Sequence, residues 1–210
     1  MKIYWLSNST FLIKTSLGEK ILIDPFDIYS NAIDHISADI ITYSKIFNTN
    51  FEAININSHC KIINTPATFQ DKSIFIKGYT SYCDNNHGLK IGNNIIYLFE
   101  IDGYKMCHLG YLGTELNSKL ISILKNSDFL FIPIGGNLVL RGNEAFKLCS
   151  KLNPKYIIPM CSKHNSNSFY YDNPKEFISL CNNIKIINDS FIDISLLPTG
   201  ANNLVLFMNR

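Results

Sequence analysis

The chain carries little charge, and the two signs nearly cancel. Asp, Glu, Lys and Arg make up 17% of the 210 residues, and the formal net charge is +2. A chain so close to neutral offers no broad basic surface for nucleic acid or an anionic membrane. Long apolar runs are also absent: stretches such as Phe129–Ile134 fall far short of the ~20 residues that cross a bilayer. These absences argue against nucleic acid and membrane as partners.

Paired cysteine motifs are absent as well. Six cysteines occur without a CxxC spacing, and the start MKIYWLSNS has no apolar segment of a signal peptide. We therefore expect a cytoplasmic protein with reduced thiols. The 46% hydrophobic content and the lack of any linker or repeat predict one globular domain over residues 1–210.

The clearest local signal lies between Asn94 and Gly113. Two apolar runs, Ile95–Ile101 and Tyr104–Cys107, flank the dipeptide Asp102-Gly103. Asp-Gly between two such runs is typical of a tight hairpin, because both central residues must take a positive φ. The second run ends in His108-Leu109-Gly110, and a strand that ends in this way can present the next side chain, Tyr111, at a sheet edge.

The remaining pattern is rich in strands in the first half and alternates helices with strands in the second half. This order suits two sheets packed face to face with helices outside. Strands are predicted at 2–6, 11–15, 20–23, 39–43, 61–64, 73–77, 129–134, 156–159, 184–187 and 204–208. Helices are predicted at 115–124, 143–152 and 174–181. Residues 30–37 are predicted to form a polar crossing segment, and residues 44–56 and 79–89 to form loops.

Six stretches, in register along nearly the whole chain, resemble the metallo-β-lactamase-fold hydrolases, and in particular the ascorbate-6-phosphate-lactonase-like branch. The stretches are MKIYWLSNSTFLIKTSLGEKILIDPF, ADIITYS, YTSYCDNNHG, NNIIYLFEIDGYKMCHLGYLG, FLFIPIGG and NPKYIIPMCSKH. The resemblance implies an α/β (α+β) fold, a four-layer αββα sandwich, with the site at one edge between the sheets.

The resemblance also implies where metal ligands would stand. The family places His, His, Asp and His in the loop after ADIITYS, a His after the next strands, a bridging Asp after HLG and a last His after PM. The corresponding positions in this chain are Lys45, Phe47, Thr49, Asn50, Cys83, Tyr111 and Cys161. None of them keeps the family's residue.

Two closely spaced divalent ions need several deprotonated or lone-pair donors, and these seven side chains supply few. The sequence therefore predicts a pseudoenzyme that has lost zinc or any other divalent metal, has no cofactor, and binds a small molecule or a protein, with assembly into homo-oligomers left open. The alternative is a residual hydrolase in the same pocket with cysteine-based or single-metal chemistry.

Cys83 and Cys161 are the central pair for that alternative, and three readings of them stay open. They fill space, they bind a soft metal together with His87 or His164, or they are redox-active or nucleophilic. Lys45 beside a thiol would lower its pKa, and Tyr111, Lys45 or His87 would move protons. His108 is predicted to be a buried, hydrogen-bonded structural residue, and Asp24 a brace for the site.

Overall fold

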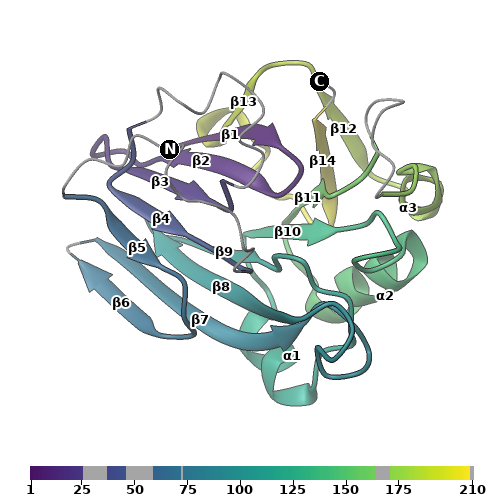
Figure 1. Ribbon diagram of the computed structural model, residues 1–210. Helices are drawn as coiled ribbons and strands as arrows, with labels where there is room; N and C mark the ends of the chain where they lie inside the picture. The colour runs from purple at the N-terminus through teal and green to yellow at the C-terminus, as the bar shows by residue number, and fades with distance from the viewer. Residues whose placement is uncertain (26–36, 46–58, 72, 164–170, 209–210) are drawn as a thin grey trace.

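Figure 1 shows the computed structural model, which describes residues 1–25, 37–45, 59–71, 73–163 and 171–208. Two β-sheets pack face to face, one with the strand order β13-β1-β2-β3-β4-β5 and the other with the order β12-β14-β11-β10-β9-β8-β7-β6. The strands of the first sheet are β1 (Lys2–Ser7), β2 (Thr10–Lys14), β3 (Lys20–Ile23), β4 (Ile40–Thr42), β5 (Lys61–Ile63) and β13 (Phe191–Asp193). Those of the second are β6 (Thr68–Asp71), β7 (Ile74–Tyr82), β8 (Asn93–Ile101), β9 (Tyr104–His108), β10 (Phe129–Pro133), β11 (Tyr156–Met160), β12 (Ile184–Ile187) and β14 (Leu204–Met208).

The hairpin β8–β9 forms as the sequence predicts. Asp102 has φ 53° and Gly103 has φ 80°, the left-handed values that a two-residue hairpin turn requires. The pairing runs from Ile101 opposite Tyr104 to Tyr97 opposite His108. The hairpin thus places His108 at the end of β9 that lies away from the Asp102-Gly103 turn.

Three helices cover one side of the eight-stranded sheet (Figure 1). They are α1 (Ser118–Leu124), α2 (Gly142–Leu152) and α3 (Lys175–Leu180). Helix α1 begins later than predicted because the Asn117 side chain caps it by accepting the Leu120 N–H. No helix among the described residues is long and apolar enough to cross a membrane.

The core has two main layers. Between the sheets lie aromatic and branched side chains from both of them, including Phe11, Phe99 and Phe131, each fully buried. A second cluster joins the helices to the outer face of the eight-stranded sheet, with Leu124 and Leu152 fully buried. Within the described residues, no helix packs on the outer face of the six-stranded sheet, so the second helical layer of a four-layer sandwich is not seen there.

The strands differ from the prediction mainly where polar residues form them. Strand β7 runs on to Tyr82, whereas the sequence pattern predicts a loop from residue 79. Strand β6 and strand β13 were not predicted, because TFQD and the three residues FID show no apolar run. Hydrogen bonds to a neighbouring strand hold these segments in the sheet without an apolar signal. The predicted crossing at 30–36 and most of the loop at 44–56 lie outside the described residues.

Candidate active site at the sheet edge

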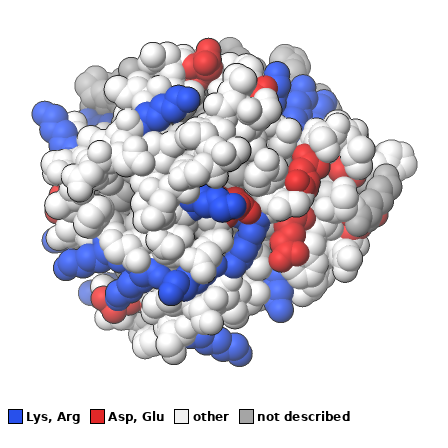
Figure 2. All heavy atoms as spheres, turned by 180° about the vertical axis from the view of Figure 1, so that it is seen from behind, with Lys and Arg blue, Asp and Glu red and all other residues white. Residues whose placement is uncertain are grey.

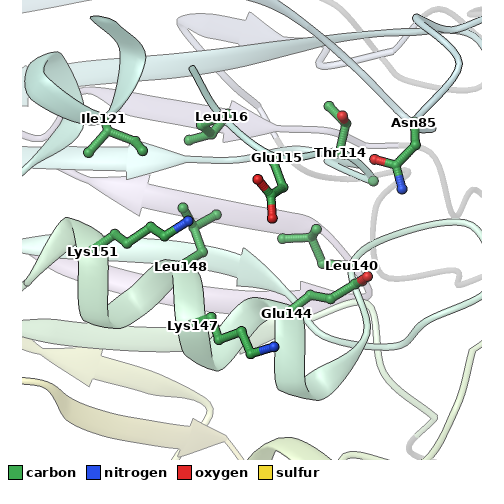
Figure 3. A pocket seen from close by; sticks show the side chains of 11 residues that line it. Asn85, Thr114, Glu115, Leu116, Ile121, Leu140, Glu144, Lys147, Leu148 and Lys151 are labelled. Atoms are coloured by element: carbon green, nitrogen blue, oxygen red, sulfur yellow. The ribbon is translucent and has the colours of Figure 1, made fainter. Parts of the chain in front are cut away.

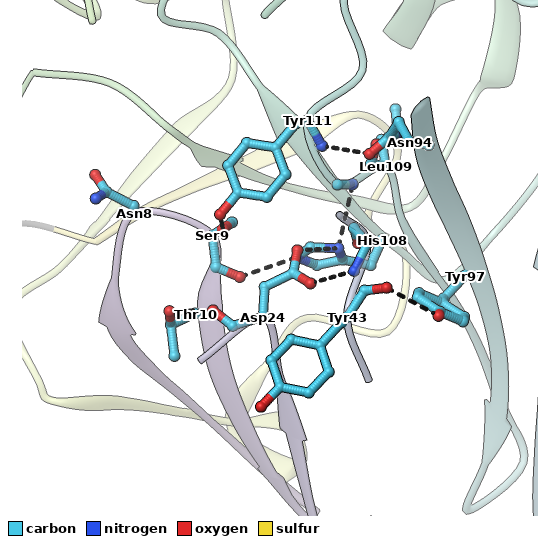
Figure 4. Close-up of polar contacts among 12 residues, drawn as sticks. Asn8, Ser9, Thr10, Asp24, Tyr43, Asn94, Tyr97, His108, Leu109 and Tyr111 are labelled. Atoms are coloured by element: carbon cyan, nitrogen blue, oxygen red, sulfur yellow. Dashed lines mark hydrogen bonds and ion pairs between the residues drawn. The ribbon is translucent and has the colours of Figure 1, made fainter. Parts of the chain in front are cut away.

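One edge of the sandwich collects the loops that follow β1, β3, β4, β7, β9 and β11. Ser9 Oγ donates to Tyr111 Oη at 2.7 Å, and the Cys161 N–H donates to the Asn8 carbonyl at 3.3 Å. The Ile95 N–H donates to the Ser44 carbonyl at 2.7 Å and ties the two sheets together. The structure therefore brings together segments that are far apart in the sequence (Figure 4).

Tyr111 is held rigidly at both ends. Its N–H donates to Asn94 Oδ1 at 2.8 Å, its hydroxyl accepts from Ser9, and its side chain is buried. The turn before it needs glycine, because Gly110 has φ +59° and a Cβ there would collide with the Asn94 and Ser44 side chains. Burial raises the pKa of Tyr111 well above its usual value, so its phenol stays neutral.

Asn94 is the residue that the sequence analysis missed. It is fully buried, and its Nδ2 donates to the Leu109 carbonyl at 2.9 Å and to Ser81 Oγ at 2.8 Å. With Tyr111 on its Oδ1, the amide holds the whole turn after β9 in place. A polar residue directly before a strand-like run was the only signal, and that pattern does not show whether the residue faces the core.

Asp24 and His108 lie side by side beneath Tyr111 and are both fully buried. Asp24 Oδ1 accepts the Ser44 N–H, while its Oδ2 lies 3.8 Å from His108 Nδ1 and has no hydrogen-bond partner among the described residues. Burial outweighs that hydrogen bond and raises the pKa of Asp24 to about 7. Asp24 thus braces the chain after β4, as predicted.

His108 is a buried structural residue, which confirms the prediction. The Gly110 N–H donates to its Nδ1 at 3.2 Å, so the proton sits on Nε2, which lies 3.1 Å from the Ser9 carbonyl. Burial lowers the pKa of His108 to about 3, so the ring is neutral. The contact with Asp24 is therefore not an ion pair, although its length would allow one.

Cys83 follows β7 and is buried, with its thiol 3.5 Å from the Asn93 carbonyl. Lys45 lowers the pKa of this thiol, as the sequence analysis expected, but desolvation is the larger effect and raises it to about 11. Lys45 itself donates to the Ile91 carbonyl at 2.9 Å. Cys83 is therefore a neutral thiol, which speaks against a nucleophile there.

The other predicted candidates are placed as follows. Cys161 is fully buried and packs in the same cluster as Cys83 and Tyr111. His87 is exposed, and its ring stands edge-on to Tyr82 with the ring centres 5.3 Å apart. The positions Phe47, Thr49, Asn50 and His164 lie outside the described residues.

These donors do not fit a two-metal site. Among the described positions, Tyr111 and Cys83 are protonated and Lys45 is a hydrogen-bond donor. The described part of the chain contains no group of three or more His, Cys, Asp or Glu side chains that could hold a metal ion. The soft-metal reading of Cys83 and Cys161 therefore finds no third ligand there.

A cavity of about 410 Å³ opens beside Cys83, and we call it the Cys83 cavity. Two cations, Lys90 and Arg141, face it, together with amide side chains. Its size is within the range of small-molecule sites. The lining residues are Cys83, Asp84, Asn85, Asn86, Lys90, Ile91, Gly113, Asn137, Val139, Arg141 and Glu144.

Known proteins resemble this chain over three quarters of its length or more. The pattern of the beta-lactamase superfamily domain matches residues 2–161. A UPF0173 metal-dependent hydrolase of Carboxydothermus hydrogenoformans is 26% identical over 191 aligned positions, in an alignment that covers 76% of this chain and 84% of that protein. One of Methanosarcina barkeri is 25% identical over 209 aligned positions, in an alignment that covers 84% of this chain and 89% of that protein.

Solved structures give the same result. A crystal structure from Thermotoga maritima, named a "putative Zn-dependent hydrolase of the metallo-beta-lactamase superfamily", has a TM-score of 0.81 and 28% identity and covers 99% of this chain and 97% of its own. A structure from Parabacteroides distasonis, at 17% identity and a TM-score of 0.68, covers 98% of this chain and 91% of its own. The latter shows the fold alone. Together they confirm the fold predicted from the sequence.

The comparisons contradict two predictions from the sequence. The predicted pseudoenzyme and the predicted loss of zinc or any other divalent metal are both wrong, because the relatives are named metal-dependent hydrolases. Both predictions rested on seven ligand positions inferred from the resemblance. Three of these, Phe47, Thr49 and Asn50, lie outside the described residues, so the described donors are an incomplete basis for declaring the chemistry lost.

Proposed function

Because the chain belongs to the metallo-β-lactamase superfamily, we propose that it is a hydrolase whose substrate binds in the Cys83 cavity. The observation that carries the proposal is the whole-chain likeness to the Thermotoga maritima structure, at 28% identity over 99% of this chain. The cavity adds support because it opens at the edge where the loops after β7 and β9 meet.

The described residues would contribute binding and positioning. Lys90 and Arg141 offer two cations to a negatively charged substrate, and Asn137 offers an amide. The network of Asn94, Ser9 and Tyr111 holds the turn that leads to Gly113, and Gly113 lines the cavity. A rigid wall with cations at the rim orients a substrate at little entropic cost.

Hydrolysis of simple substrate classes tests the proposal directly. The purified protein is assayed with ester, lactone and phosphodiester chromogenic substrates, each with added Zn²⁺, with added Mn²⁺ and with a chelator. The expected result is turnover of at least one class above the level of heat-denatured protein. The metal content, measured on protein purified without chelator, shows whether turnover follows bound metal. Absence of turnover for every class under every metal condition would contradict the proposal.

The Arg141→Gln variant separates binding from the hydrolytic step. Since Arg141 faces the cavity and is exposed, its loss should raise KM for an anionic substrate with little change in kcat. Lys119→Gln is the matched control, because Lys119 is exposed on α1 and does not line the cavity.

We also propose that the protein is cytoplasmic and acts on a small molecule. The cysteine spacing supports the first part, and the size of the Cys83 cavity supports the second. Cell fractionation tests the location.

A further inference from the structure

A second cavity adjoins the Cys83 cavity and shares a wall with it. It has a volume of about 420 Å³ and lies between α1, α2 and the loop after Tyr111 (Figure 3). Asn85, Gly113 and Glu144 line both cavities. The two cavities therefore lie next to each other around these three residues. We call the second one the α1–α2 cavity.

The floor of the α1–α2 cavity is apolar. Leu116, Leu140 and Leu148 are buried by 91% or more, yet they line the space, and Ile121 closes it from α1. Figure 3 shows Leu116 and Leu148 facing the cavity from opposite walls. These four aliphatic side chains favour an alkyl group in their part of the cavity. The other side chains of the lining are polar or charged: Asn85, Thr114, Glu115, Glu144, Lys147 and Lys151.

The Cys83 cavity, in contrast, is lined by two cations and two carboxylates, whose formal charges cancel. Its two carboxylates are already engaged: Asp84 accepts the backbone N–H groups of four residues, and Glu144 accepts the Arg141 N–H. Within the described part of the chain, Lys90 and Arg141 enter no ion pair. The side chains of the two cations, unlike those of the two carboxylates, are therefore not already bound by described residues, which favours an anionic ligand group that accepts hydrogen bonds from them.

Figure 2 gives the wider context. On the face shown there, acidic and basic side chains are interspersed among uncharged ones, so no broad field of one sign covers it.

We propose that the two cavities form one binding site for an amphiphilic acyl anion: an alkyl chain in the α1–α2 cavity, and a carboxylate or phosphate held by Lys90 and Arg141 beside Cys83. This inference rests on the proposed function, and it names the substrate class of the hydrolase as an acyl compound with a negatively charged group. Two lysines of α2 also line the α1–α2 cavity, Lys147 and Lys151. Their aliphatic stems cover the alkyl chain of the ligand.

Calorimetric titration with simple amphiphiles tests the inference without any turnover. Octanoate should bind at least tenfold more tightly than butyrate, because four more methylene groups leave water. Octylammonium, with the same chain and the opposite charge, should bind at least tenfold more weakly than octanoate. Equal affinity for octanoate and butyrate, or for octanoate and octylammonium, would overturn the inference.

Two pairs of variants locate the site. Ile121→Gln should weaken octanoate at least fivefold, whereas Leu196→Gln, at an exposed leucine elsewhere, should leave it unchanged. Arg141→Gln should weaken octanoate at least fivefold, and Lys119→Gln should not. Thermal unfolding of each variant shows that it is folded. Octanoate affinity that is unchanged in both Ile121→Gln and Arg141→Gln would place the ligand elsewhere and refute the inference.

The outcomes also separate this inference from the proposed function. If an ester, lactone or phosphodiester is hydrolysed but octanoate does not bind, the hydrolase proposal stands and the acyl-anion site falls. If octanoate binds as expected and no substrate class is turned over, the site stands and the hydrolase proposal falls.

Discussion

The buried polar network beneath Tyr111 and the Cys83 cavity beside it differ in how their polar groups are used. In the network, the amide of Asn94 makes three hydrogen bonds and His108 makes two. In the cavity, Lys90 and Arg141 are exposed, and no described residue forms an ion pair with them. Groups satisfied within the protein stabilise it, while groups left to solvent are available to a ligand.

The comparison predicts its largest effect at Asn94. Asn94→Ala leaves the Tyr111 N–H and the Leu109 carbonyl without their buried partner, which should lower the free energy of unfolding by about 2–5 kcal/mol. Urea unfolding, followed by the fluorescence of the single tryptophan, Trp5, measures this. Asn85→Ala, at an exposed asparagine of the cavity, is the matched control and should change little. A similar decrease in the free energy of unfolding in both variants would contradict the distinction between the buried network and the cavity.

Cys83 lies at the boundary between the buried network and the cavity. The reactivity of its thiol shows to which of the two regions it belongs. With its pKa raised to about 11 by burial, the thiolate fraction at neutral pH is about 300-fold below that of free cysteine. Iodoacetamide should therefore alkylate Cys83 at least a hundredfold more slowly than free cysteine, as followed by mass spectrometry. Cys83→Ser identifies its adduct, and urea-unfolded protein shows full labelling. Labelling of Cys83 as fast as free cysteine would assign it to the reactive cavity.

The pH dependence of stability follows from Asp24 and His108, whose pKa values burial shifts to about 7 and about 3 from ordinary values of 3.8 and 6.5. Between about pH 4 and 7, folded Asp24 holds a proton that the unfolded chain has released, so stability falls as pH rises. Between about pH 3 and 6.5, folded His108 lacks a proton that the unfolded chain holds, so stability rises with pH. The two slopes, each about 1.4 kcal/mol per pH unit, oppose each other.

Asp24→Asn should therefore expose the slope of His108. The amide oxygen still accepts the Ser44 N–H. The amide does not titrate, so the decrease in stability with rising pH that Asp24 causes disappears. We expect the free energy of unfolding of this variant, relative to the native protein, to rise by about 2 kcal/mol from pH 4.5 to pH 6. Urea unfolding at several pH values measures it, and Asp189→Asn, at an exposed position, is the control. Parallel profiles for Asp24→Asn and the native protein would show that the Asp24 carboxyl does not titrate in this range.

The sequence predicted the fold better than it predicted the site, for physical reasons. Apolar periodicity and the Asp102-Gly103 turn are local signals, and they located the hairpin and most strands. The buried amide of Asn94 depends on contacts with Leu109 and Tyr111, more than a dozen residues away, and no local pattern encodes these. The electrostatics of Cys83 could not be predicted either, because a neighbouring lysine and burial act in opposite directions and only the structure shows which is larger.

The smallest effect is expected at Arg141, and it completes the comparison. Its backbone N–H, not its side chain, is bound by Glu144 at the start of α2, so Arg141→Gln keeps that contact. The guanidinium is exposed, and no described residue forms an ion pair with it, so the free energy of unfolding should change by less than about 0.5 kcal/mol. Urea unfolding under the conditions used for Asn94→Ala measures it. A decrease of more than about 1 kcal/mol in the free energy of unfolding exceeds what an ordinary surface substitution causes. It would show that the Arg141 side chain supports the fold. A change within the expected limit, together with weaker octanoate binding, would show a residue kept for a ligand.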